Sequence, residues 1–120
     1  MFGALGAISR ALLGAWLNPA DVTSGIPWGT VAVNISGCFV LGLLAGLTMT
    51  SERVPAALRA PLMTGFLGSF TTFSTFSVET VRLLEAGALA AAAASLLLQL
   101  VGGLLAAAAG MAVGRALGGP

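Results

Sequence analysis

Apolar residues form four long stretches along the chain, and short polar connections separate them. A helix that spans a membrane needs about 20 residues. The stretches cover residues 2–17, 28–49, 61–84 and 87–114, and residues 28–49 contain no charged side chain. This pattern predicts an all-α membrane protein, with residues 1–120 forming one integral membrane domain of four transmembrane helices.

The boundaries of the first stretch carry their own signals. Proline cannot continue a helix, so Asn18 and Pro19 are expected to end it. A polar linker over residues 20–26 follows, and Pro27 suits the first turn of the next helix. Arg10 interrupts the stretch and further apolar segments follow, which favours a retained first span over a cleaved signal peptide.

The third stretch has an unusual centre. Between Ser69 and Ser77, six of nine residues are Ser or Thr and the other three are Phe. Two glycines, Gly65 and Gly68, precede this run. The combination predicts a helix broken at membrane depth around residues 68–72, which requires surrounding protein or a water-filled cavity. A kinked helix whose hydroxyls bond to its own backbone is an equal alternative from composition alone.

Composition and charge narrow the classes of function. Of the 120 residues, 58% are hydrophobic and only 8% are charged, whereas a soluble domain carries about 25% charged residues. The net charge of +1 argues against nucleic acid as a partner. The chain has no histidine and one cysteine, so it offers no Ser–His or Cys–His catalytic set and is expected not to be an enzyme.

The arginines divide unevenly between the two ends of a four-span protein. Arg53, Arg59 and Arg115 fall on one side, and Arg82 falls towards the other. Positive residues prefer the cytoplasmic side, but this bias rests on very few charges. We therefore expect that the chain can insert in both orientations.

Uncharged hydrogen-bond donors and phenyl rings gather in the third stretch and suit a small, hard anion. Ring edges carry partial positive charge, and Phe73 and Phe76 alternate with the hydroxyls of Ser74 and Thr75. Asn34 in the second stretch adds an amide. No lysine or arginine lies within the cluster, which fits the weak binding that conduction requires. Ordinary helix packing is the alternative interpretation of both the rings and the amide.

Other polar residues are open to two interpretations. Glu79 and Arg82 lie three residues apart and are expected to form a local ion pair, although an ionisable group at membrane depth often has a function. Ser95 and Gln99 give the fourth stretch a polar stripe, for which packing is slightly favoured.

Three polar motifs occur in order: Gly6-Ala7-x-x-Arg10, Gly29-Thr30-x-x-x-Asn34-x-x-Gly37, and Gly65-x-x-Gly68-Ser69-x-Thr71-Thr72-Phe73-Ser74-Thr75-Phe76. In these motifs, and over nearly its whole length, the chain resembles the Fluc/CrcB fluoride channels. The resemblance implies four helices per subunit with a broken third helix. It also implies an antiparallel, dual-topology dimer, made with a second inverted copy or a paralogue, that encloses two fluoride pores in the bilayer.

The same resemblance implies roles for individual residues. Asn34 would donate to fluoride, Phe73 and Phe76 would supply ring edges, and Ser74 and Thr75 would supply hydroxyls. Thr30 and Glu79 match polar positions near the pore, and Arg10 matches a position at its entrance. The backbone carbonyls of Gly68 and Thr71 would hold a structural Na⁺ at the dimer centre.

The function that the resemblance implies is passive export of fluoride across the cytoplasmic (inner) membrane by a multi-pass channel, which relieves fluoride toxicity. A small four-helix, proton-coupled multidrug exporter is the alternative, but such a transporter needs a deep carboxylate and the first stretch has Arg10 instead. A packing subunit of a larger complex is a third possibility, which leaves the Phe/Ser/Thr run unexplained.

Overall fold

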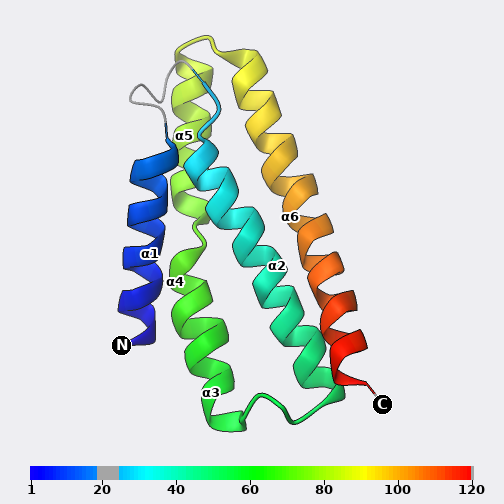
Figure 1. Cartoon of the computed structure of the whole chain (residues 1–120). Helices are drawn as coiled ribbons and strands as arrows, with labels where there is room; N and C mark the ends of the chain where they lie inside the picture. The colour runs from blue at the N-terminus through cyan, green and yellow to red at the C-terminus, as the bar shows by residue number, and fades with distance from the viewer. Residues whose placement is uncertain (19–24, 120) are drawn as a thin grey trace.

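The computed structural model describes residues 1–18 and 25–119, and these residues form helices and no strand. The prediction of an all-helical protein is therefore confirmed. Three long helices are α1 (Phe2–Leu17), α2 (Trp28–Thr50) and α6 (Leu89–Gly118). Four shorter helices, α3 (Ala56–Ala60), η1 (Pro61–Leu67), α4 (Gly68–Phe70) and α5 (Phe73–Glu85), lie end to end as a fourth column beside them (Figure 1).

The lengths of the helices suit a membrane to different degrees. The helices α2 and α6, with 23 and 30 residues, are long and apolar enough to cross a bilayer. The helix α1 is apolar but shorter, with 16 residues, and covers the same range as the first predicted span. The other three predicted spans have different bounds. The span 28–49 corresponds to α2, which continues to Thr50, and the span 87–114 corresponds to α6, which runs from Leu89 to Gly118. The span 61–84 lies within the column of short helices from Ala56 to Glu85.

Local hydrogen bonds account for two of the helix ends. Asn18 leaves the helical conformation after α1, and its Oδ1 accepts the N–H of Gly29 at 2.9 Å, which ties the end of α1 to the start of α2. Pro19 and the predicted linker residues 20–24 lie outside the described residues. Gly87, with a φ of +75°, reverses the chain between α5 and α6 in a conformation that favours glycine.

Glycines allow α2 and α6 to pack backbone against backbone. A Cβ added to Gly42 or Gly46 would overlap a carbonyl oxygen of α6, and a Cβ added to Gly110 or Gly114 would overlap a carbonyl oxygen of α2. Small residues that let helices approach closely are the usual packing device in membranes. Gly42 and Gly46, four residues apart on α2, therefore serve the packing of α2 against α6.

The fourth column is interrupted between α4 and α5. Thr71 and Thr72 have extended backbones, with φ and ψ of −76° and 154°, and −150° and 113°. The expectation that glycines cause the break is wrong, because Gly65 lies inside η1 and Gly68 keeps helical dihedral angles of −63° and −31°. The interruption falls where α2 supplies alternative hydrogen-bond partners, as described below.

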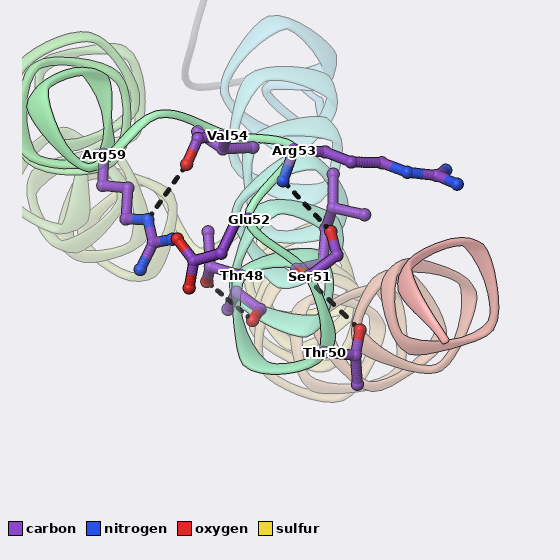
Figure 2. A network of polar contacts seen from close by, with 9 residues as sticks. Thr48, Thr50, Ser51, Glu52, Arg53, Val54 and Arg59 are labelled. Atoms are coloured by element: carbon purple, nitrogen blue, oxygen red, sulfur yellow. Dashed lines mark hydrogen bonds and ion pairs between the residues drawn. The ribbon is translucent and has the colours of Figure 1, made fainter. Parts of the chain in front are cut away.

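Polar contacts hold the connection between α2 and α3 at one end of the bundle (Figure 2). Arg59 donates to Glu52 at 2.6 Å and to the carbonyl of Val54 at 3.1 Å. Arg53 donates to the carbonyl of Leu117 at 2.8 Å and so joins this connection to the C-terminal turn of α6. These contacts lie at the end of the molecule remote from the turn between α5 and α6 (Figure 1).

Candidate functional site

One face of α2 carries three of the residues that the sequence motif singled out. Thr30, Asn34 and Gly37 lie three or four residues apart and therefore on one side of the helix. The Thr30 hydroxyl contacts α5, and the Asn34 amide contacts the backbone of Thr72. A Cβ at Gly37 would overlap the methyl group of Thr71. This face of α2 thus follows the interrupted column at close range.

Asn34 replaces the helical partners of the interrupted backbone. Its Oδ1 accepts the N–H of Thr72 at 2.8 Å, and its Nδ2 donates to the carbonyl of Thr72 at 3.0 Å. In a continuous helix this peptide N–H would donate to Gly68 and this carbonyl would accept from Phe76. One amide side chain therefore satisfies both backbone groups at the point where the helix ends.

Gln99 of α6 completes the hydrogen bonding of this amide. The second hydrogen of Asn34 Nδ2 is donated to Gln99 Oε1 at 2.7 Å. Gln99 Nε2 in turn donates to Ser95 Oγ at 3.1 Å, and Ser95 is fully buried. Both hydrogens of the Asn34 amide are thus engaged, so a direct bond from Asn34 to an anion requires one of these two bonds to open.

Thr72 is also the N-cap of α5, a role that the sequence pattern did not predict. Its Oγ1 accepts the N–H of Thr75 at 3.2 Å and donates to Thr75 Oγ1 at 3.0 Å, while Ser74 Oγ lies 3.5 Å away. A threonine hydroxyl that accepts from a first-turn N–H is an N-cap. The signal in the sequence was a threonine directly before a helical segment, but adjacent hydroxyls left several candidates for the cap.

Glu79 is buried, with 7% of its surface exposed, and bonds across to α2. Its Oε1 accepts from Thr30 at 2.9 Å, whereas its Oε2 has no hydrogen-bond partner among the described residues. The expected ion pair with Arg82 does not form: within the described ranges, the ion pair shorter than 4 Å is Arg59 with Glu52. Thr30 takes the place of Arg82 because it faces Glu79 from the packed helix.

The phenylalanines form two separate pairs, one on each side of the interruption. The rings of Phe66 and Phe70 are stacked, with centroids 6.0 Å apart, and those of Phe73 and Phe76 are tilted by 57° at 5.6 Å. The extended backbone of Thr71 and Thr72 separates the two pairs. Phe76 is buried, whereas 74% of Phe73 is exposed.

Thr72 lines two cavities. The first, of about 230 Å³, is lined by the predicted residues Asn34, Phe73 and Phe76, and by Thr72 and Gln99. None of the residues that line it is charged, and its polar groups are amides, hydroxyls and the thiol of Cys38 beside the phenyl rings. Such a surface can bind a small anion weakly through ring edges and neutral donors.

The second cavity, of about 300 Å³, contains Arg10. It is lined by Arg10, Asn18, Thr30, Thr72 and Thr75, which come from α1, its C-terminal end, α2, the interruption and α5. Thr75 therefore lies by the cavity with the guanidinium, while Phe73 and Phe76 lie by the uncharged one. Ser74 lies with Thr75 and Glu79 in a further open pocket on α5.

The interruption leaves the last carbonyl groups before α5 without their helical donors, and those of Gly68 and Thr71 are among them. In a continuous helix Gly68 would accept from the N–H of Thr72, and Thr71 from that of Thr75. These N–H groups instead donate to Asn34 Oδ1 and Thr72 Oγ1. Carbonyl oxygens are suitable ligands for a hard cation. Across residues 1–18 and 25–119, no group of three or more acidic, histidine or cysteine side chains offers another metal site.

Comparisons with known proteins identify close relatives. The family model described as "CrcB-like protein, Camphor Resistance (CrcB)" matches residues 1–111. A fluoride-specific ion channel FluC of Syntrophotalea carbinolica is 45% identical over 117 residues, which are 98% of this chain and 94% of the relative. The protein of the same name from Bordetella petrii is 46% identical over 114 residues, 95% of this chain and 86% of the relative.

Proposed function

The chain belongs to the CrcB-like protein family, and we propose that it is a fluoride-selective ion channel, because close relatives of the chain are named fluoride-specific ion channels. Its function is therefore passive transport and not an enzymatic reaction. The observation that carries the proposal is the uncharged cavity beside Thr72, in which the rings of Phe73 and Phe76 accompany the amides of Asn34 and Gln99.

No lysine or arginine side chain lines this cavity, and this suits rapid passage of an anion. A lysine or arginine there would bind fluoride strongly and slow its release, whereas ring edges and neutral donors bind more weakly. Ser74 and Thr75 provide hydroxyls on the first turn of α5. Asn34, Phe73, Phe76, Ser74 and Thr75 are accordingly the proposed pore residues.

Arg10 is proposed to attract fluoride at the entrance of the pore. Its cavity is also lined by Thr30, Thr72 and Thr75, whereas Phe73 and Phe76 line the uncharged cavity. A cation outside the narrow uncharged part raises the local anion concentration without holding the ion there. Thr30 and Glu79 are proposed to line the polar path between the entrance and α5, since they bond to each other across α2 and α5.

A second, inverted copy of the chain, or a paralogue, is proposed to complete the pores. One subunit leaves 74% of the Phe73 ring exposed, and the cavities beside Thr72 are open at the surface of the bundle. Four helices are too few to enclose a polar path and to shield it from lipid at the same time. An antiparallel, dual-topology dimer in the cytoplasmic (inner) membrane supplies the missing wall.

The carbonyls of Gly68 and Thr71 are proposed to hold a structural Na⁺ at the centre of this dimer. Their helical donors bond instead to Asn34 and Thr72, which leaves both oxygens available to a cation among the described residues. A bound Na⁺ would supply positive charge to the interrupted backbone of both subunits. The chain's own contribution is to hold the two carbonyls free of helical hydrogen bonds.

The proposed role in the cell is passive fluoride export. Fluoride enters acidified cells as neutral HF, ionises inside and is trapped, and an open anion channel lets it leave down the membrane potential. The proton-coupled multidrug exporter is not supported, because the relatives are named as fluoride channels and the first helix carries Arg10 in place of an acid.

Efflux from liposomes tests this function directly. Purified protein reconstituted in liposomes loaded with fluoride is expected to release fluoride rapidly, and to release chloride far more slowly under the same gradient. Protein-free liposomes are the control. Equal passage of chloride, or no release of fluoride, would contradict the proposal.

A further inference from the structure

Three arginines lie at the end of the bundle that holds the C-terminal turns of α2 and α6 (Figure 1). Arg59 forms an ion pair with Glu52 at 2.6 Å. Arg53 and Arg115 are exposed, and within the described part of the chain no carboxylate lies within 4.0 Å of either guanidinium. Figure 2 shows the side chain of Arg53 directed away from Glu52 and Arg59. Two positive charges at this end are therefore not neutralised by the described residues.

The fold holds both of these side chains against the last turns of α6. Arg53 donates from Nη1 to the carbonyl of Leu117 at 2.8 Å. Nη2 of Arg115 lies 3.1 Å from Sδ of Met111 and 4.0 Å from Sδ of Met49. A guanidinium has five N–H donors, and a thioether sulfur is only a weak acceptor. Each arginine therefore keeps N–H groups for a stronger acceptor, while contacts within the chain fix its position.

Apolar surface adjoins the two arginines. Met49 and Leu117 are exposed, and each contacts one of the guanidiniums through its sulfur or its carbonyl oxygen. The carbonyls at the end of α6 carry partial negative charge that repels an anion, but Arg53 covers the carbonyl of Leu117. A ligand at this end therefore meets positive charge and apolar side chains together. An anionic phospholipid offers the matching chemistry, since it joins a phosphate to acyl chains.

We propose that Arg53 and Arg115 bind the headgroup of an anionic phospholipid, with its acyl chains along Met49 and Leu117. Both arginines lie at the ends of α2 and α6, the helices long and apolar enough to cross a bilayer, and this places them at the height of the headgroups. A guanidinium binds phosphate oxygens through charge-assisted hydrogen bonds. The bound lipid joins the connection after α2 to the last turn of α6. Lipid binding at this end does not require that the chain conduct fluoride.

Native mass spectrometry of the full chain in detergent tests the site. Phosphatidylglycerol, which is anionic, is expected to bind more tightly than phosphatidylcholine, which has a phosphate but no net charge. Arg53→Gln and Arg115→Gln should each weaken the binding of phosphatidylglycerol about fivefold, the contribution of one basic residue near an anionic lipid surface. Arg82→Gln is the matched control, because this exposed arginine lies in the last turn of α5 at the opposite end, and it should leave this binding unchanged.

Further variants separate loss of charge from loss of structure. Arg53→Lys with Arg115→Lys keeps both charges and should retain most of the affinity, whereas the double glutamine variant should lose about 25-fold. Arg115→Gln alone decides the matter if the double variant fails to fold, because Arg115 contacts only sulfur atoms through its guanidinium among the described residues. Unchanged binding in Arg115→Gln, an equal loss in Arg82→Gln, or equal binding of the two lipids overturns the site. Displacement of the lipid by equimolar inorganic phosphate would also overturn it, since the acyl chains would then contribute nothing.

Discussion

At the scale of single residues, the centre of the molecule depends on side chains that replace backbone hydrogen bonds. Asn34 satisfies both peptide groups of Thr72, and the Thr72 hydroxyl satisfies the N–H of Thr75. Buried backbone groups without partners are costly, so the interruption persists only where such replacements exist. This explains why two threonines, and not the preceding glycines, leave the helix.

Phe76→Ile is expected to reduce fluoride efflux by about tenfold, since an aliphatic side chain has no electropositive ring edge. Phe76 is buried beside the uncharged cavity, and isoleucine fills much of its volume, so the fold should remain intact. Efflux from liposomes measures the effect. Phe39→Ile changes a partly exposed ring on α2 outside this cavity and serves as the control. Equal losses in both variants would argue against a specific role of the Phe76 ring.

Thr30→Val is expected to lower the free energy of unfolding by about 1–3 kcal/mol, because it leaves a buried polar group without its partner. The affected group is the Glu79 carboxyl, whose Oε2 already lacks a partner among the described residues. Thermal unfolding in detergent measures the change. Thr30→Ser keeps the hydroxyl and should unfold close to the original temperature. If the two variants unfold alike, the bond to Glu79 does not contribute to stability.

At the scale of helices, contact between α2 and α6 differs from the contacts around the interruption. Gly42 and Gly46 face α6, and Gly110 and Gly114 face α2, so the two long helices are held by close backbone packing. In contrast, the column from α3 to α5 is joined to α2 by side-chain hydrogen bonds at Thr30 and Asn34. The long pair therefore forms a rigid frame against which the interrupted column is positioned.

Gly114→Ala tests this frame. The added methyl group would overlap the carbonyl oxygen of Leu43 and force the helices apart, and overpacking of this kind costs about 1–3 kcal/mol. Gly103→Ala is the matched control on the same helix, because its Cβ would lie at an ordinary 3.5 Å from Cys38 Sγ. Thermal unfolding should therefore separate the two variants. A Gly114→Ala protein as stable as Gly103→Ala would mean that the close contact is not required.

At the scale of the whole molecule, positive charge gathers at one end of the bundle. Arg53 and Arg59 lie in or after the connection from α2 to α3, and Arg115 lies in the last turn of α6 at the same end (Figure 1). Arg82 lies in the last turn of α5, close to Glu85, at the opposite end. Glu52 pairs with Arg59 and partly offsets the excess. The proposed insertion in both orientations requires that this small difference in positive charge between the two ends does not favour one orientation strongly.

Labelling of a terminal cysteine measures the orientation. In a Cys38→Ser background, Gly119→Cys should react with a membrane-impermeant maleimide in about half of the molecules on intact cells, as weak charge bias implies. Glu85→Lys adds positive charge at the other end and should increase the labelled fraction. Complete labelling, or none, would show a single orientation and would point to a paralogue as the inverted partner.

The sequence by itself determined the membrane character, the all-helical fold and the family. The apolar stretches and the motifs that contain Asn34 and residues 65–76 are local patterns, and each can be recognised without knowing its neighbours in space. The sequence also placed the unusual backbone close to residues 68–72. It could not assign the interruption to Thr71 and Thr72, because hydrogen-bond partners elsewhere in the chain decide which residues can leave a helix.

Only the tertiary structure decided how the polar residues are paired. Glu79 bonds to Thr30 and not to Arg82. Asn34 bonds to Thr72 and Gln99, which lie far from it along the chain. Gln99 is indistinguishable in sequence from a residue that merely packs helices together. The physical reason is that a buried donor takes whichever acceptor the folded helices bring within about 3 Å, and helix packing sets that distance.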